Sequence, residues 1–369
     1  MDFNFTDDQL SLRDMVARWV DKGFSFERRH ALAKAGGKTR DVYRELAELG
    51  LTGLVVGDDY GGMGMGAVEA MVVMEELGRG LVNAPYAAGA LVAPSLLAVA
   101  PDALKSAWLP RIASGEALVV LAHQEREARY RLDQVATRAA EQGGSWRVDG
   151  SKSVVPAGDE ADAFIVPAHT AHGIRLFLVE RAAAQVRGYA TQDGGRAAEV
   201  AMSGAAAQLV TVDGLTALER GVDAGIAALC AEAVGVMEKY VALTVEYMNT
   251  RKQFGVPIAS FQALRHRVAD VKMALELARS MSYYASLKLG EPAPQRRRAL
   301  SQAKVQLGQS MRFVGQQCTQ MHGGIGVTDE YIGSHYFKRL TMLEMSFGDT
   351  MHHLGEVSAR MQDTAGVFA

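Results

Sequence analysis

Two segments of the sequence combine residue types that suit a phosphate-bearing ligand. One reads Arg251-Lys252-Gln253-Phe254-Gly255-Val256-Pro257-Ile258, and the other covers residues 320–331 and contains Gly323-Gly324. An arginine at the end of a long helix offers a planar, permanently charged fork for phosphate oxygens. Paired glycines after a helix let backbone N–H groups approach a ligand closely. A surface ion pair or a helix cap explains each segment alone, but together they indicate a site for a phosphate-bearing ligand.

The hydrophobic pattern divides the chain into three parts that would position these segments. The first part has helical spacing and begins with a capping box, Thr6 with Gln9. Short apolar runs and turn residues from Ala117 onward, among them Asp149-Gly150, predict a compact antiparallel β domain. After the β domain, apolar residues again recur at helical spacing over long stretches. Helices, strands and helices in this order indicate an α+β fold with domains at residues 1–116, 117–215 and 216–369.

Composition excludes several classes of protein. With 49% hydrophobic and 22% charged residues, the 369-residue chain is not expected to be disordered. The net charge of −3 leaves no basic excess for nucleic acid. Two cysteines and no signal-peptide pattern favour the cytoplasm. Pro85 and Pro94 interrupt the uncharged stretch 81–100, so buried helices are expected there and no membrane span. Seventeen methionines suggest long packed helices.

With these motifs in this order, the sequence resembles the acyl-CoA dehydrogenase family over essentially its whole length. Tyr60-Gly61-Gly62 and Glu75-Glu76-Leu77-Gly78 add to the resemblance. It implies an N-terminal helical domain, a middle antiparallel β-barrel domain and a C-terminal four-helix bundle that drives a dimer or a dimer of dimers. It also implies FAD as cofactor, an acyl-CoA thioester as substrate, α,β-desaturation as the reaction and electron-transfer flavoprotein as the electron acceptor.

The resemblance also assigns individual residues to the cofactor. Arg251 and Phe254 resemble residues that reach a flavin held mainly by the neighbouring subunit. The resemblance implies cofactor contacts for five further residues: Gln262, Gln320, Gly323, Gly324 and Thr350. The first four of these would cradle the pyrophosphate and adenosine. No metal site is expected, because the histidine pairs 169/172 and 352/353 lack cysteine or carboxylate neighbours in ligand spacing.

The expected catalytic carboxylate is missing from its usual place. The reaction needs a base to remove the α-proton of the thioester, and many family members carry Glu-Gly-Thr after an aromatic residue. Here the segment reads Ser346-Phe347-Gly348-Asp349-Thr350, with glycine in the glutamate position. Asp349 is the candidate base, and it could equally cap the following helix. No glutamate stands at 223–226, where other members carry the base, and Glu232 is expected to support the structure.

The β domain departs from the family as well. Where the family places a tryptophan and a threonine against the flavin, the chain has Val154 and Pro156. Proline has neither a hydroxyl nor a backbone N–H to offer. Upstream, Glu125-Arg126-Glu127-Ala128-Arg129-Tyr130 replaces the usual glycine- and serine-containing turn.

These departures lead to competing hypotheses. Residues that hold a flavin ring in the chain's own β domain are altered, whereas those that reach a partner's flavin are retained. The chain is therefore interpreted as an acyl-CoA dehydrogenase or as one subunit of a heteromeric one, in a heterotetramer whose partner supplies the base. A homodimer or homotetramer that uses Asp349 is the competing form. A subunit without catalysis, acting as a structural or FAD-completing partner, is the alternative function. The chain resembles subunits of a reduced type that act on steroid side-chain or dicarboxylic acyl-CoA substrates, so a bulky or unusual acyl-CoA is expected.

Overall fold

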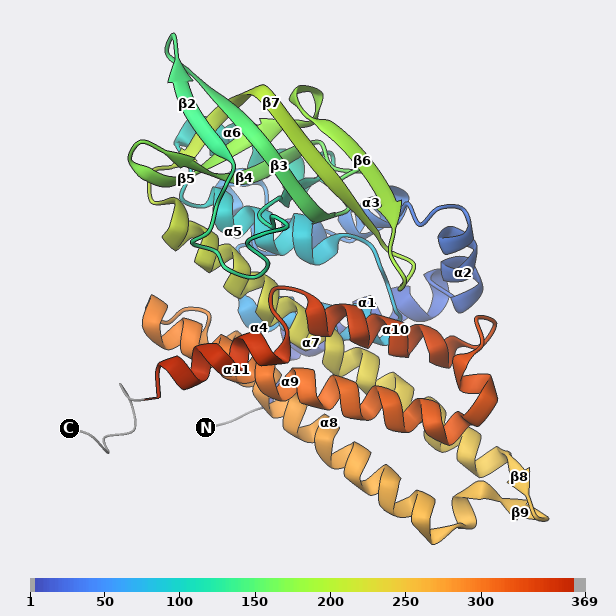
Figure 1. Cartoon of the computed structure of the whole chain (residues 1–369). Coiled ribbons are helices and arrows are strands. Elements are labelled where there is room, and N and C mark those ends of the chain that lie inside the picture. Colours follow the sequence, from blue (N-terminus) through green and yellow to red (C-terminus); the bar gives the residue numbers. More distant parts are fainter. Residues whose placement is uncertain (1–3, 362–369) are drawn as a thin grey trace. The chain divides into compact units, whose positions relative to one another are not determined.

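The computed structural model describes residues 4–361 and divides into two compact units (Figure 1). Unit 1 comprises residues up to Arg29, residues 71–82 and residues from 226 onward; unit 2 comprises residues 30–70 and 83–225. The N-terminal helices thus divide between the two units, and the boundaries at 116 and 215 stay a prediction. The α-helices and the π-helix η3, in chain order, are α1 (Asp7–Gly23), α2 (Phe26–Lys34), α3 (Arg40–Glu48), α4 (Ala67–Arg79), η3 (Ala87–Val92), α5 (Ala93–Leu97), α6 (Asp102–Ala113), α7 (Gly214–Thr250), α8 (Gln262–Lys288), α9 (Ala293–His322), α10 (Ile332–Met345) and α11 (Thr350–Ala359).

Helix α1 begins with the capping box that the sequence predicts. The Gln9 N–H donates to Thr6 Oγ1 at 3.3 Å, and the Thr6 N–H donates to Gln9 Oε1 at 3.0 Å. Two donors that the first helical turn leaves without partners are thereby satisfied. The uncharged stretch 81–100 folds into η3, α5 and their connections. Within residues 4–361, no helix combines the length and the hydropathy needed to cross a bilayer.

Unit 2 contains a closed β-barrel, as the resemblance implies. Its strands are β1 (Val119–Leu121), β2 (Arg138–Gln142), β3 (Ser145–Pro156), β4 (Ala163–Thr170), β5 (Gly173–Glu180), β6 (Gln185–Ala190) and β7 (Arg196–Thr211). The order β4-β2-β3-β7-β5 closes through a β4–β5 pairing, while β1 adds to β4 and β6 adds to β7. Buried apolar side chains such as Val148, Phe164 and Phe177 fill the interior. The barrel is mixed, because β1 and β2 both pair with β4 in parallel.

One turn prediction is wrong. Asp149-Gly150 lies inside β3, and the turn between β2 and β3 falls at Gly143-Gly144, where both φ values are positive. Gly150 marks a register shift between β3 and β7 instead. An ideal Cβ on Gly150 would lie 2.6 Å from Thr137 Oγ1, and φ is +147°. The glycine is therefore required for a β-bulge, which produces the same sequence pattern as a turn.

Unit 1 is a helical bundle built on close backbone contact. Figure 1 shows α7, α8, α9 and α10 side by side, the four-helix bundle that the resemblance implies. Helix α4 crosses α7 at two glycines: a Cβ on Gly78 would lie 2.2 Å from Glu232 O, and one on Gly235 would lie 1.8 Å from Glu75 O. Any side chain there would separate the helices, which explains the glycine of the Glu-Glu-Leu-Gly motif.

Candidate functional site

Arg251 and Phe254 lie where α7 ends and a short hairpin begins. The hairpin strands β8 (Lys252–Gln253) and β9 (Val256–Pro257) enclose the two-residue turn Phe254-Gly255, whose φ values are +55° and +81°. Phe254 is 92% exposed, and its ring contacts Phe261 edge-on at 6.1 Å. A bulky residue with positive φ is rare and costs backbone energy. The hairpin thus presents an aromatic side chain to the outside of this chain.

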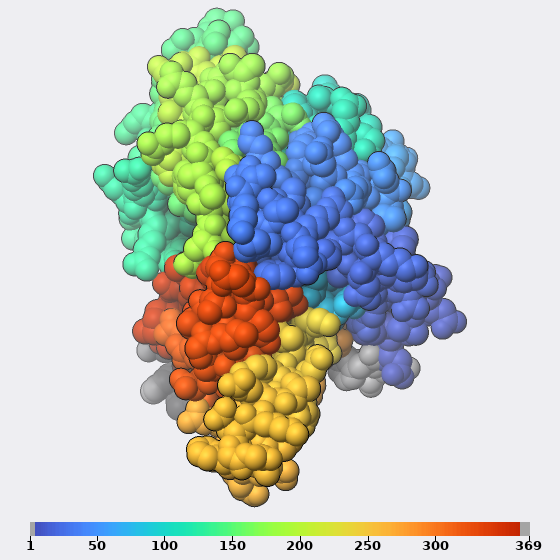
Figure 2. All heavy atoms as spheres, turned by 90° about the vertical axis from the view of Figure 1, so that its right-hand side faces the viewer, coloured from blue at the N-terminus to red at the C-terminus, as the bar shows by residue number. Residues whose placement is uncertain are grey.

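The Arg251 side chain is exposed at the start of this hairpin. It forms no ion pair or hydrogen bond with any residue between 4 and 361. Its backbone is fixed, because the Arg251 N–H donates to Tyr247 O and the Ile258 N–H donates to Arg251 O, both at 2.8 Å. In Figure 2 the yellow segment holding the end of α7 and the hairpin forms one end of unit 1. This end therefore carries a positioned cation with its charge available to an anion.

Gln320, Gly323 and Gly324 lie at the neighbouring helix end, where α9 stops. Gly323 has φ +65° and ψ −143°, a conformation that only glycine adopts without strain. A Cβ on Gly323 or Gly324 would meet nothing within 4 Å. The glycines therefore leave open space that no residue from 4 to 361 fills. Tyr247 of α7 and His322 of α9 contact each other at 4.7 Å between ring centroids, which brings this loop next to the Arg251 segment.

The two remaining predicted cofactor residues, Gln262 and Thr350, lie in different parts of unit 1. Gln262 is the first residue of α8 and is exposed at the base of the hairpin. Thr350 begins α11, and its N–H and hydroxyl both donate to Glu344 Oε1, at 3.0 and 2.7 Å. Thr350 packs against Gly308 of α9. At about 1.5 Å per residue, Gly308 lies about 22 Å along the helix axis from Gly323. Unit 1 therefore gathers six of the predicted residues at one end and places Thr350 elsewhere.

Asp349 caps α11. Its Oδ1 accepts the His352 N–H at 2.8 Å, and its own φ and ψ of −81° and 172° are those of an N-cap residue. This geometry matches the capping alternative for Asp349. The role of Asp349 as base remains a prediction.

Gly348 has no room for a side chain. Its φ is +109°, and an ideal Cβ would lie 2.6 Å from His352 Cδ2 and 2.6 Å from His353 Nε2. His353 is fixed by Ser301 Oγ at 3.3 Å and Phe347 O at 3.0 Å, and burial lowers its pKa to about 3. Two imidazoles thus occupy the space into which a residue-348 carboxylate would extend. The motif comparison alone did not predict this crowding.

Lys304 anchors the segment that leads to Gly348. It is fully buried in α9 and donates from Nζ to Leu343 O at 2.9 Å and to Glu344 O at 2.7 Å. Burial lowers its pKa to about 8. The ammonium satisfies carbonyls at the end of α10, where the helix has no further N–H donors. Glu232 is also structural, since it forms a two-pronged ion pair with Arg339 at 2.5 and 2.8 Å.

The altered segments of unit 2 are tied into the barrel. Glu125 accepts hydrogen bonds from the Ala136 N–H at 2.6 Å, from the Thr137 N–H and hydroxyl at 3.1 and 2.7 Å, and from Lys152 Nζ at 2.6 Å. Lys152 is fully buried and also donates to Pro167 O at 2.8 Å. The segment that replaces the family's cofactor turn is therefore held by the chain's own carboxylate.

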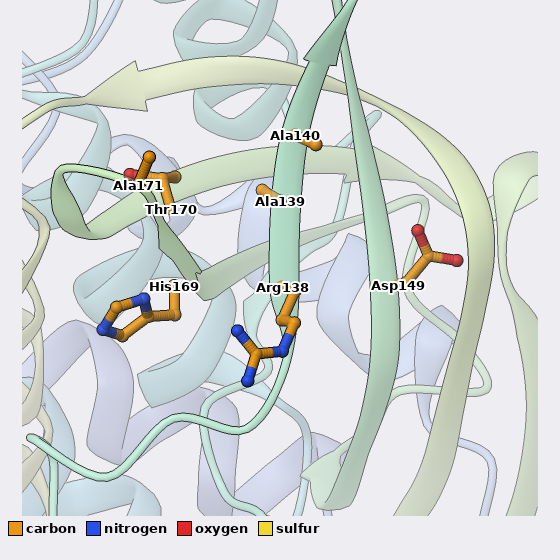
Figure 3. A pocket seen from close by; sticks show the side chains of 7 residues that line it. All are labelled: Arg138, Ala139, Ala140, Asp149, His169, Thr170 and Ala171. Atoms are coloured by element: carbon orange, nitrogen blue, oxygen red, sulfur yellow. The ribbon is translucent and has the colours of Figure 1, made fainter.

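A pocket of about 400 Å³ opens in unit 2 where β2 and β4 diverge (Figure 3). One pair, Arg138 with His169, joins these strands. Figure 3 shows both side chains on the same side of the pocket and Asp149 pointing away from them. The side chains of Arg138 and His169 could together bind an anion in this pocket. Sequence reasoning missed this pocket, because the pairing of distant strands cannot be read from local pattern.

Comparisons with known proteins identify the family. Residues 6–116 match the acyl-CoA dehydrogenase N-terminal domain, and residues 212–362 match the acyl-CoA dehydrogenase C-terminal domain. Acyl-CoA dehydrogenase IpdE2 of Mycobacterium tuberculosis (strain ATCC 25618 / H37Rv) is 32% identical over 90% of this chain and 91% of its own. The chain belongs to the acyl-CoA dehydrogenase family, whose members bind FAD.

Two solved structures share the fold over nearly the full length. One is a variant of the Tcur3481-Tcur3483 steroid ACAD, with 25% identity, a TM-score of 0.90, and coverage of 98% of this chain and 99% of that chain. The other is the ChsE4-ChsE5 complex from Mycobacterium tuberculosis, with 26% identity, a TM-score of 0.88, and coverage of 99% and 100%. The fold class and family predicted from the sequence are confirmed.

The residues of unit 1 fit part of an FAD molecule. A free guanidinium at Arg251 and an open glycine loop at 323–324 suit the negatively charged pyrophosphate. The positions expected to face the flavin ring fit less well, because Val154 is 46% exposed with φ +52°, and Pro156 has no N–H. The fit therefore covers the dinucleotide contacts in unit 1 and does not extend to the ring contacts in unit 2.

Proposed function

We propose that this chain is one subunit of a heteromeric, FAD-dependent acyl-CoA dehydrogenase, in which it completes the cofactor site and the partner supplies the catalytic base. The observation that carries this proposal is position 348. Glycine stands there with φ +109°, and His352 and His353 fill the space of a side chain. The adjacent carboxylate of Asp349 is used as a helix cap.

The chemistry explains why a missing base matters. Bound FAD supplies an acceptor for the hydride that leaves the β-carbon of the acyl-CoA. Removal of the α-proton requires a carboxylate within hydrogen-bond reach of it. The Asp349 carboxylate already accepts the backbone N–H of His352, so it is directed at its own helix. The dehydrogenation is therefore assigned to a site whose base lies on the other chain.

Retained cofactor residues support the FAD-completing role. The Arg251 side chain has no partner among residues 4–361, and the space beside Gly323 and Gly324 is open, so all three suit a ligand that approaches from outside. A chain that had lost all connection with FAD would have no use for an exposed, unpaired arginine next to an open glycine loop. This contrast favours the heteromeric dehydrogenase over a purely structural partner.

Exposed apolar residues support association with another chain. Met273 and Leu277, one turn apart on α8, are 60% and 50% exposed, and Met351 on α11 is 72% exposed. Large apolar side chains gathered on helix faces indicate protein–protein contact. The solved ChsE4-ChsE5 structure is described as a complex. A heterotetramer with a second acyl-CoA dehydrogenase chain is the assembly that we propose.

The substrate that we propose is a bulky acyl-CoA of the steroid side-chain type. One of the solved structures with the same fold is described as a steroid ACAD. Electron-transfer flavoprotein is the acceptor that we propose for the reduced enzyme.

Base-deletion variants of the co-expressed complex test this function. Asp349→Asn in this chain should leave turnover of an acyl-CoA within about twofold, because asparagine caps a helix as well as aspartate does. Removing the carboxylate that the partner chain carries at the position equivalent to Gly348 should lower kcat by about a hundredfold or more. If Asp349→Asn abolishes turnover while the complex stays folded, Asp349 is the base and the proposal is wrong.

A further inference from the structure

His322 is a buried histidine between the two cofactor segments of unit 1. It is the last residue of α9 and is 3% exposed. Its Nδ1 lies 2.8 Å from Cys318 O. Three tyrosine rings surround the imidazole, with centroids 5.8 Å away for Tyr240, 4.7 Å for Tyr247 and 5.1 Å for Tyr331. The ring is therefore held by one hydrogen bond and three aromatic contacts.

These contacts connect the helix ends that carry the cofactor residues. Tyr247 O accepts the N–H of Arg251, so the Tyr247 ring lies one helical turn before the free guanidinium. His322 directly precedes Gly323, whose N–H donates to Gln320 O. The His322–Tyr247 contact thus ties the end of α7 to the end of α9. A shift of either ring would change the spacing between Arg251 and the glycine loop.

The second ring nitrogen of His322 has no partner. Nε2 is buried, and no residue in the described range 4–361 forms a hydrogen bond with it. Nδ1 faces a carbonyl and therefore carries the hydrogen, which leaves Nε2 as the acceptor of a neutral ring. Burial lowers the pKa of His322, which favours this neutral form. A buried acceptor without a donor costs stability, and such exceptions call for an explanation.

We propose that His322 is a positioning residue for the bound dinucleotide: its ring holds Arg251 and Gly323 in register, and its Nε2 accepts a hydrogen bond from a hydroxyl of the ligand. A phenylalanine would pack between the tyrosines equally well. Only a histidine adds a buried acceptor next to the glycine loop. The inference rests on the proposed FAD contacts of Arg251 and Gly323.

The experiment measures FAD affinity and thermal unfolding of the assembled complex after removal of its flavin. His322→Phe keeps an aromatic ring in the cluster and removes both nitrogens. It should weaken FAD binding by about tenfold, the effect of one hydrogen bond. His322→Ala and Tyr247→Ala should each weaken FAD binding further. The fold loss of FAD affinity in the double variant should be smaller than the product of the two single fold losses. Leu307→Ala, fully buried on the same helix, is the control for general destabilisation.

The outcomes separate this inference from the proposed function. The inference is supported if the His322 variants lose more FAD affinity than Leu307→Ala at an equal loss of thermal stability. It is overturned if they lose no more than that control. If Arg251→Ala also leaves FAD affinity unchanged, the proposed cofactor contacts are wrong and the inference falls with them. If Arg251→Ala weakens binding and the His322 variants do not, the positioning role alone is wrong.

Discussion

Placing the family's glutamate at position 348 should destabilise the fold of this chain and should not give it dehydrogenase activity of its own. A residue other than glycine at φ +109° pays a backbone cost of about 1–2 kcal/mol. The new Cβ would lie 2.6 Å from both His352 Cδ2 and His353 Nε2, and such overpacking costs about 1–3 kcal/mol. Gly348→Glu should therefore lower the free energy of unfolding by about 2–5 kcal/mol.

The assay is urea unfolding of the purified chain, with two comparison variants. Gly348→Ala adds the same Cβ without a carboxylate and should lose nearly as much stability. Gly355→Ala, inside α11 with nothing within 4 Å of its Cβ, should instead gain up to about 1 kcal/mol. Adding His352→Ala to Gly348→Glu should recover part of the steric cost and none of the backbone cost.

The result that would refute this reasoning is a Gly348→Glu chain as stable as the original. Dehydrogenase turnover by that variant without a partner would refute it more strongly. Either outcome would mean that position 348 tolerates a side chain. The glycine would then be no evidence against a base in this subunit.

Three further perturbations test the local structure. Asp349→Ala should cost about 1 kcal/mol of unfolding free energy, whereas Asp349→Asn should cost a few tenths, as measured by urea unfolding. Lys152→Met should cost about 3–5 kcal/mol by leaving Glu125 charged and buried, and the double variant with Glu125→Gln should cost less than the two single changes added together. Burial lowers the pKa of His123 to about 4, so between pH 6.5 and 4 the unfolded chain binds a proton that the folded chain excludes. His123 alone should therefore lower the stability by up to about 3 kcal/mol as the pH drops through that window, and His123→Gln should remove that part of the fall while the part due to His353 remains.

Features set by nearby residues could be predicted from the sequence. The capping box of α1 depends on Thr6 and Gln9, three residues apart, and it forms as predicted. Arg251 and Gly323-Gly324 could be singled out as well, because each follows a long helical pattern, and their role at a dinucleotide stays a prediction. Their adjacency depends on the contact between Tyr247 and His322, which no local pattern reveals.

Features set by distant contacts were missed or misinterpreted. Asp149-Gly150 reads as a turn, but the glycine is needed because Thr137, just before the neighbouring strand β2, lies against it. Lys304 holds the end of α10 from 40 residues away in the chain, so its role cannot be read from its neighbours. The sequence showed that a glutamate was absent at Gly348, but only the structure shows that its space is occupied.

Flavin content per chain is the most direct test of the central claim. The chain would be purified alone and after co-expression with the product of the adjacent reading frame, and released FAD would be counted against protein. The heteromer account predicts no flavin and no turnover for the chain alone, and one FAD for every two chains in an active complex. A yellow homo-oligomer with one FAD per chain and its own turnover would contradict it.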